Sequence, residues 1–245
     1  MLCTLAIENY RSVRSLVVPV RQLTVVTGPN GSGKSSLYRS LRMLAEAATG
    51  GLIGFLAREG GLPSTLWAGP ETIARGIRTG ALPTQGQQRK GPVRLQLGFA
   101  ADDFSYSIDL GLPQATKTAF TLDPEIKVEC IWAGEALRPS SVLAERRGGL
   151  VRVRRQDGDW DEVTTSLASF HSMLSETADP RSAPEVLHLR QMVRSWRFYD
   201  HFRTDRDAPA RRAQVGTRTT ALDHEGRDLA AALQTIRELG DPDAL

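Results

Sequence analysis

The chain has 245 residues, of which 40% are hydrophobic and 24% charged, and its net charge is only +3. These values are ordinary for a soluble globular protein with a sizeable core, and the small net charge gives no general argument for nucleic-acid binding. No apolar run reaches the length of a membrane span, so no membrane partner is expected.

The N-terminus and the cysteines favour a cytoplasmic protein. The first eight residues lack the charged start and long apolar core of a signal peptide. Cys3 and Cys130 lie far apart and in no C-x-x-C arrangement. We therefore expect reduced thiols, with neither a disulfide framework nor a zinc site.

The chain begins with residues of strand type. Apolar and β-branched residues predict a strand pair at Leu2–Glu8 and Val13–Val18, with a turn-like segment between them at Asn9–Ser12. A third short segment, Leu23–Val26, has the composition of a buried strand.

A complete phosphate-binding loop follows directly. Residues Gly28–Ser35 read G-P-N-G-S-G-K-S, which fits the pattern G-x-x-x-x-G-K-S. From position 36 to 48 the apolar residues recur at helical spacing. A strand, a glycine loop and a helix in this order are the context that makes the motif a phosphate site.

Each residue type in this loop has a role in binding ATP. The glycines permit a close approach of the backbone, and the N–H groups of the loop and of the first helical turn form an anion nest. Lys34 is expected to reach the β- and γ-phosphates, and the Ser35 hydroxyl to bind Mg²⁺. Ser36 is either an α-phosphate contact or an ordinary first-turn serine. The candidate residues of the loop are Gly28, Pro29, Asn30, Gly31, Ser32, Gly33, Lys34, Ser35 and Ser36.

The rest of the chain separates into two regions. The glycine-punctuated stretch 51–91 favours an ordered surface excursion or a mobile lid. Alternating patterns then predict antiparallel strands, with a hairpin turn at Asp102-Asp103, and helical patterns follow. The expected strands are Val93–Phe99, Phe104–Leu110, Ile126–Trp132 and Leu150–Arg154, and the expected helices are Ser166–Leu174, Pro184–Trp196 and Asp228–Leu239.

The fold class expected from this order is α/β, a phosphate-loop core with an antiparallel β subdomain and a helical subdomain. We place the core at 1–50, the mainly antiparallel β part at 51–165 and the mainly helical part at 166–245, all within one lobe. Asp241 and Pro242 are helix-start signals after the stop signal Gly240. Because the chain stops as that helix would begin, we expect a sequence truncated at its C-terminus.

Other patterns are less specific. Arg190, Arg194 and Arg197 have the spacing of one helix face beside aromatic residues, which is open to two interpretations. They could contact nucleic-acid backbone, or form a solvated helix face followed by a core strand, and we favour the second. The segment Asp157–Glu162 is reminiscent of a calcium loop but lacks the glycine at the sixth place and the glutamate at the twelfth, where Ala168 stands, so a hairpin turn is expected. The four histidines have no metal-binding spacing.

The groups that hydrolysis requires are not evident. ATP hydrolysis in phosphate-loop enzymes uses an acidic residue at the end of an apolar strand to hold Mg²⁺, and a group that orients water. We find no convincing strand of this kind after the loop, and we assign no catalytic residue. Glu129, Glu185 and Asp223 are the nearest substitutes.

The N-terminal residues resemble a known group of proteins. Ile7-Glu8-Asn9-Tyr10-Arg11-Ser12-Val13, followed by Leu23–Leu37 with asparagine third in the loop, is similar to the N-terminus of RecF-like and SMC-like ATPases of the ABC-type superfamily. Three later segments resemble bacterial predicted AAA-type ATPases with a RecF-like core. These segments are Asp123–Lys127, Trp196–Asp200 and Gly226–Leu233.

The resemblance implies ATP–Mg²⁺ binding, and hydrolysis in a head-to-tail homodimer in which each loop is completed by the partner's signature motif. It also implies that Arg11 approaches the nucleotide, although a strand-turn arginine is an equal alternative. In that family the signature motif and the acidic Mg²⁺-binding strand lie in the C-terminal part, so this chain alone is expected to be inactive. DNA repair, phage defence and regulation all use this fold, and the sequence does not select among them. A non-hydrolysing nucleotide sensor or interaction module is the alternative, and a phosphate-loop kinase is disfavoured.

Overall fold

The computed structural model describes residues 1–69, 94–114, 118–155, 157–177, 179–200 and 202–240. The chain divides into two compact units, Met1–Arg194 and Ser195–Leu245. The candidate loop lies in the first unit.

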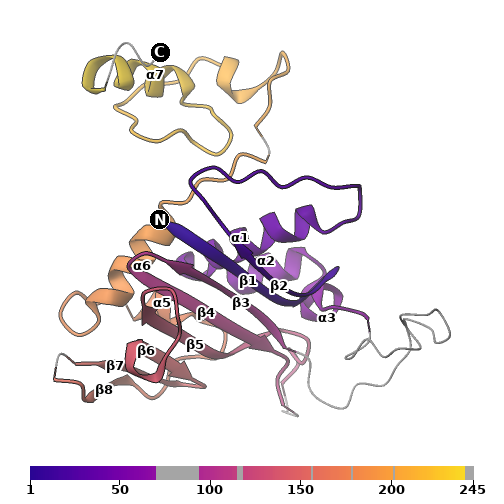
Figure 1. The fold of residues 1–245 in the computed structure, drawn as a ribbon. Helices are drawn as coiled ribbons and strands as arrows, with labels where there is room; N and C mark the ends of the chain where they lie inside the picture. The colour runs from indigo at the N-terminus through magenta and orange to yellow at the C-terminus, as the bar shows by residue number, and fades with distance from the viewer. Residues whose placement is uncertain (70–93, 115–117, 156, 178, 201, 241–245) are drawn as a thin grey trace. The chain divides into compact units, whose positions relative to one another are not determined.

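An eight-stranded antiparallel sheet forms the centre of the first unit (Figure 1). Its order is β2-β1-β3-β4-β5-β6-β7-β8, so the strands follow the chain except that β1 lies between β2 and β3. The strands are β1 (Leu2–Tyr10), β2 (Val13–Pro19), β3 (Leu95–Ala101), β4 (Phe104–Gly111), β5 (Glu125–Ala133), β6 (Val142–Arg147), β7 (Leu150–Arg154) and β8 (Trp160–Thr164).

The strand predictions from alternation are largely confirmed. The pairs β1–β2 and β3–β4 form as expected, and the second has its turn at Asp102-Asp103. Strands β5 and β7 coincide with the predicted segments, and the carboxylates from Asp157 to Glu162 occupy the turn and first residues of the β7–β8 hairpin. Alternation identified these strands because one face of each is buried.

Helices cover one face of this sheet. The helix α1 (Lys34–Thr49) packs against α2 (Leu52–Arg58), α5 (Met173–Glu176), α6 (Pro184–Arg194) and the strands β1 and β3. The described residues of the unit also form the short helix α3 (Gly61–Thr65) and the 3-10 turn η1 (Pro139–Ser141). Residues buried between α1 and the sheet include Leu5, Ile7, Met43, Leu44, Leu97 and Phe99. This packing fixes the N-terminal end of α1, where the candidate loop ends.

The segment Leu23–Val26 is not a strand, which corrects the prediction. It runs as irregular chain, and the residues Leu23, Val25 and Val26 are 83%, 75% and 46% exposed. A strand forms only when a neighbour accepts and donates its backbone hydrogen bonds. Strand β2 is the edge of the sheet and ends at Pro19, and no described strand pairs with the segment. Leu23–Val26 therefore has the composition of a strand but no neighbouring strand among the described residues.

Two further segments differ from the sequence-based expectation. The region expected to be a surface excursion contains α2 and α3, and their residues Leu52, Leu56 and Leu62 are at most 2% exposed. Residues 70–93 of that region lie outside the described residues. The helix expected at Ser166–Leu174 is limited to Met173–Glu176. Its expected first turns are irregular chain, in which carbonyl groups accept hydrogen bonds from an arginine of the sheet, as described below.

The second unit contains the 3-10 turn η2 (Pro209–Arg211) and α7 (Leu229–Leu239). The predicted helix α7 is confirmed, and it ends at Gly240 as its sequence indicates. Irregular chain is joined to α7 by the Thr219 N–H, which donates to Thr235 Oγ1 at 2.9 Å. The helix start expected after Gly240 lies outside the described residues.

Candidate nucleotide-binding site

The glycine loop closes on itself immediately before α1. Gly28, Gly31 and Gly33 have φ values of 154°, 80° and 98°, which side-chain-bearing residues rarely adopt. The Ser32 N–H donates to the Pro29 carbonyl at 3.3 Å, and a Cβ atom at Gly28 would lie 2.9 Å from Ser32 Oγ. Glycine is thus required where the loop is most tightly folded.

The loop delivers the chain to an open helix N-terminus. Gly33 is the N-cap residue of α1 and makes no side-chain capping hydrogen bond, and the first turn contains no acidic residue. The first N–H groups of a helix have no partner within the helix and attract anions. A 16-residue helix that begins at Lys34 therefore presents uncapped donors directly after the loop.

Lys34 is held within the loop by backbone oxygens. Its ammonium group donates to the carbonyls of Gly28 and Pro29 at 2.6 and 2.8 Å. A phosphate oxygen can accept the same kind of charge-assisted bond, so the lysine already lies where an anion in the loop would meet it. Pro29 and the neighbouring Asn30 are exposed members of the loop.

The two serines of the first helical turn differ in burial. Ser35 is exposed, so its hydroxyl is free of core packing, as a ligand of a metal ion would need to be. Ser36 is only 6% exposed, which is the environment of a packed first-turn serine. An α-phosphate contact by Ser36 stays a prediction, and its buried side chain makes the backbone N–H the better donor.

Arg11 lies at the tip of the β1–β2 turn beside this loop. A Cβ atom at Gly33 would lie 3.2 Å from the Oγ atom of Ser12, the residue that follows Arg11. The Arg11 guanidinium pairs with the carboxylate of Glu59, and Arg39 Nη1 donates to the same Glu59 oxygen at 3.2 Å. The chain thus places Arg11 near the loop and gives it an internal acidic partner.

Sequence reasoning missed Glu59 and Arg39. Glu59 is the C-cap residue of α2, and Arg39 lies in the second turn of α1, so the contact joins residues 20 positions apart. Neither residue belongs to a recognisable motif. The sequence feature that could have indicated this contact is Glu59 itself, an acidic residue at the C-terminal end of a short helix, where the helix dipole does not favour a negative charge.

Glu129, which was considered as a substitute acidic residue, is engaged in a buried network. Glu129 and Arg146 are opposite each other on β5 and β6, form an ion pair of 3.0 Å, and have fully buried side chains. Glu129 also accepts hydrogen bonds from Tyr106 Oη at 2.6 Å, Ser172 Oγ at 2.5 Å and the Met173 N–H at 2.8 Å. These four bonds occupy the carboxylate, so Glu129 supports the fold and is not available to a metal ion.

The other two substitutes are also accounted for locally. Glu185 lies in the first turn of α6, where a carboxylate stabilises the helix. Asp223, in the second unit, accepts from Arg227 Nε at 3.1 Å. No residue of the described chain is assigned here as the acidic ligand of Mg²⁺.

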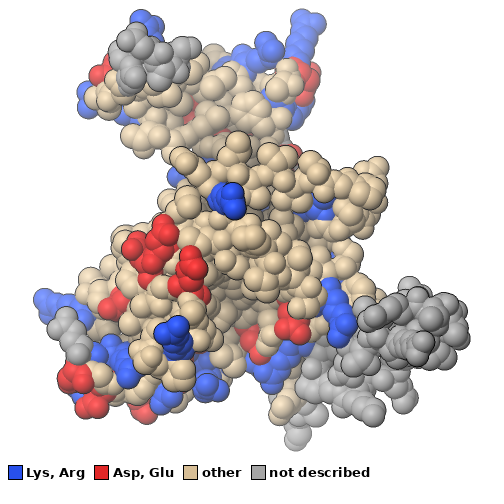
Figure 2. All heavy atoms as spheres, in the orientation of Figure 1, with Lys and Arg blue, Asp and Glu red and all other residues tan. Residues whose placement is uncertain are grey.

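The expected face of three arginines does not form on one helix. Helix α6 ends at Arg194, and Arg197 belongs to the second unit. Arg190 Nη1 donates to the Ser175 carbonyl at 3.2 Å, which ties it to the chain near α5. The core strand expected after this helix is irregular chain. Figure 2 shows Lys, Arg, Asp and Glu interspersed over the visible face of the first unit, without a broad surface of one sign.

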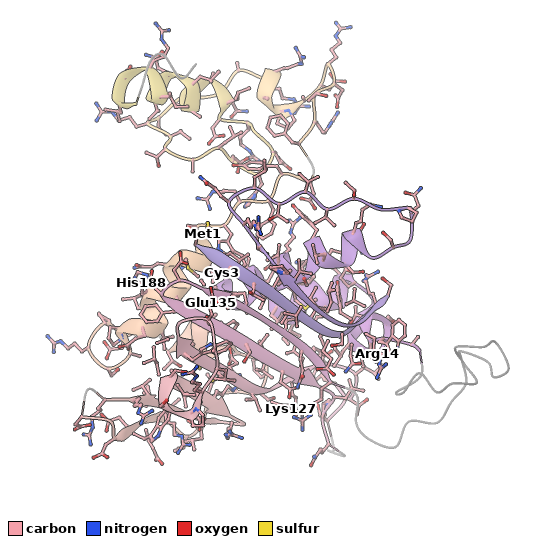
Figure 3. The ribbon with its side chains drawn as sticks, viewed as in Figure 1. Met1, Cys3, Arg14, Lys127, Glu135 and His188 are labelled. Atoms are coloured by element: carbon pink, nitrogen blue, oxygen red, sulfur yellow. The ribbon has the colours of Figure 1, made fainter. Side chains whose placement is uncertain are left out.

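Both cysteines are free thiols. Cys3 lies at the start of β1 near Met1 and Glu135 (Figure 3), and its thiol donates to Asp102 Oδ1 at 3.2 Å. The hydrogen bond to the Asp102 carboxylate raises the pKa of Cys3. Burial, with the nearby Glu145 carboxylate, raises the pKa of Cys130 to about 11. In the described part of the chain no three metal-binding side chains gather into a cluster. None of the described helices has the length and apolar character that crossing a membrane requires.

One comparison with known proteins bears on this site. Residues 1–55 match a family model of the AAA ATPase domain, so the match covers β1, β2, the loop and α1. No curated protein matches the chain. The family match supports nucleotide binding and ATPase activity of the AAA type.

Proposed function

We propose that the chain binds ATP–Mg²⁺ at the loop Gly28–Ser35, as the nucleotide-binding part of a RecF-like or SMC-like ATPase. The observation that carries this proposal is the closed glycine loop ending at the uncapped N-terminus of α1, with the Lys34 ammonium on two loop carbonyls. The residues present fit a triphosphate because they combine a cation, flexible backbone positions and uncapped N–H groups.

The residues have distinct roles in this proposal. The loop and first-turn N–H groups hold the phosphates, Lys34 exchanges the Gly28 and Pro29 carbonyls for phosphate oxygens, and the Ser35 hydroxyl is the protein ligand of Mg²⁺. Arg11 adds a second cation at the phosphates. Bound Mg²⁺ would neutralise phosphate charge and favour attack on the γ-phosphate.

Binding by these groups does not by itself accelerate hydrolysis, because equal stabilisation of substrate and transition state leaves the barrier unchanged. The acidic Mg²⁺ ligand and the group that orients water are not assigned among the described residues. We propose that both groups come from a C-terminal part of the kind that RecF-like and SMC-like ATPases carry, and that each loop of the ABC-type core is completed by the signature motif of a second copy in a head-to-tail homodimer. Roles in DNA repair or phage defence would be those of the assembled protein.

The test is Mg²⁺–ATP binding by calorimetry for the parent and Lys34→Ala. Loss of one charge-assisted contact of roughly 1.5–3 kcal/mol predicts about 10- to 150-fold weaker binding. Lys127→Ala is the matched control, because Lys127 (labelled in Figure 3) lies on β5 and its ammonium pairs with the Glu125 carboxylate of the same strand. Equal affinity of folded parent and Lys34→Ala would contradict the site.

Phosphate release separates the ATPase from the sensor. The purified chain alone is expected to release phosphate at background rates. Turnover of about 1 s⁻¹, the low end of the usual enzyme range, would show that the chain is catalytically complete. A rise in phosphate release on addition of a chain that carries the family's C-terminal signature motif and acidic strand would support the ATPase, and binding without turnover under that condition would favour a non-hydrolysing sensor.

A further inference from the structure

We infer that Glu59 holds Arg11 away from the phosphates until nucleotide binds, and that binding transfers Arg11 from Glu59 to the nucleotide. This inference rests on the proposed function and adds a regulatory contact to the same site. It is carried by the positions, partners and burial of three side chains, Arg11, Glu59 and Arg39.

The backbone at Arg11 is fixed, so only its side chain can change partner. The Arg11 N–H donates to the Thr65 carbonyl at 2.7 Å, and the Trp67 N–H donates to the Asn9 carbonyl at 3.0 Å. An isolated β-bridge joins Tyr10 to Leu66 between these two bonds. The last two residues of β1 and the turn residue Arg11 are thereby attached to the end of α3 and the two residues after it. A Cβ atom at Gly33 would lie 3.2 Å from Ser12 Oγ, so the residue after Arg11 lies beside the loop.

The position of the Glu59 carboxylate is stabilised by the two arginines and not by its own helix. It is the C-cap residue of α2, where the helix dipole disfavours a negative charge. Its side chain is 15% exposed, and it accepts from both Arg11 and Arg39. A largely buried carboxylate is stable only when cations or donors surround it. The two guanidinium groups meet this requirement.

The transfer leaves each of the three groups with a partner of opposite charge. When Arg11 leaves, Arg39 stays 3.2 Å from the Glu59 oxygen, so the carboxylate keeps a cationic partner. Arg11 Nε is buried and has no hydrogen-bond partner among the described residues, so Glu59 satisfies this guanidinium only in part. A triphosphate offers several anionic oxygens and suits the two-pronged geometry of arginine.

Lys34, like Arg11, is bound to protein oxygens in this structure. Its ammonium is occupied by the loop carbonyls of Gly28 and Pro29. Both cations proposed for the phosphates are therefore bound to protein oxygens in this structure. Since carbonyls cannot be removed by substitution and a carboxylate can, Glu59 is the contact at which the competition can be measured.

The experiment compares Mg²⁺–ATP affinity by calorimetry in the parent, Glu59→Gln, Arg11→Ala and the double variant. Glu59→Gln keeps the side-chain shape and removes the charge, so we expect about 2- to 5-fold tighter binding, the range of a partly exposed ion pair. Arg11→Ala should weaken binding. In the Arg11→Ala background, Glu59→Gln should change nothing, because the competitor then has no arginine to hold.

Controls distinguish the contact from a general charge effect. Glu46→Gln is the matched control, because Glu46 lies about 18 Å along α1 from Lys34. Tighter binding by Glu59→Gln that persists without Arg11 would show simple repulsion of the phosphates, and weaker binding would show that Glu59 aims Arg11 at them. Either result overturns the inference. If Glu59→Gln does not fold, Glu59→Asp retains the charge but withdraws it by one methylene, and a smaller tightening is expected.

Lys34→Ala keeps the two proposals separate. If it does not weaken binding, the loop is not the site and the proposed function fails. If Lys34→Ala weakens binding as predicted while Glu59→Gln has the parent affinity, the site stands and only the role of Glu59 is refuted.

Discussion

Substitution of Glu129 by alanine should be among the most destabilising single changes in the first unit. Glu129 accepts four hydrogen bonds, including one from Arg146, and both side chains are fully buried. Arg146 also donates to the carbonyls of Gly148, Ala168 and His171 at 2.7, 2.9 and 2.5 Å. The network therefore joins the centre of the sheet to the irregular chain before α5.

The magnitude follows from what the alanine leaves behind. Glu129→Ala removes the one carboxylate that pairs with the buried Arg146 among the described residues and leaves a full positive charge unpaired, which costs about 3–5 kcal/mol in comparable buried pairs. Arg146→Ala should cost a similar amount, because it also leaves three carbonyls without this donor. Glu129→Gln should cost less, because the amide oxygen can still accept from Tyr106 or Ser172.

The assay is urea unfolding followed by tryptophan fluorescence. A Trp196→Phe background removes the tryptophan of the second unit, so the signal reports Met1–Arg194. We expect a lower midpoint for Glu129→Ala with an unchanged slope. A loss below about 1 kcal/mol, in a variant with parent-like circular dichroism, would refute the argument that this pair is buried and fully engaged.

Three other results are expected. In a Cys3→Ala variant at pH 8, Cys130 should react with a disulfide reagent about 100-fold more slowly than a free thiol, because its pKa of about 11 leaves little thiolate; a rate near that of free cysteine would contradict its burial. Burial holds the pKa of Tyr106 well above its ordinary value, so above about pH 10 the hydroxyl ionises only in the unfolded chain and the free energy of unfolding falls. That fall with pH should be smaller in Tyr106→Phe, and an equal fall in the variant would contradict a role for the Tyr106 hydroxyl. Labelled duplex DNA should not bind the chain through Arg194 or Arg197, so its fluorescence anisotropy should not rise on addition of protein. A salt-sensitive rise that disappears when either arginine is neutralised would reverse this expectation.

The sequence predicted the elements whose patterns are local. The loop Gly28–Ser35 and the following helix need only nearby residues, and the β3–β4 hairpin needs only alternation and a polar turn. Leu23–Val26 has equally strong strand composition, yet it is exposed irregular chain. Composition states that a segment suits a sheet, but pairing depends on a second strand that local sequence does not contain.

The long-range contacts, in the core and at the candidate site, were harder to predict. Glu129 was visible as a charge inside an apolar strand, and its pairing with Arg146 follows once the register of β5 and β6 is known. Glu59 gave a weaker signal. Its role depends on α2 ending beside the β1–β2 turn, and the chain reaches that arrangement through the bonds at Thr65 and Trp67. Such long-range geometry is not encoded in residue spacing.

The backbone at Arg11 indicates a trade between stability and chemistry. Its φ of 49° is left-handed, a conformation that asparagine and glycine adopt readily and that costs other residues of order 1 kcal/mol. Asn9, two residues earlier, has φ 59° and is of the suited type. An Arg11→Asn variant should therefore relieve backbone strain while losing the guanidinium. We interpret this strained turn as support for the nucleotide contact proposed for Arg11, because left-handed backbone at residues other than glycine gathers at functional sites.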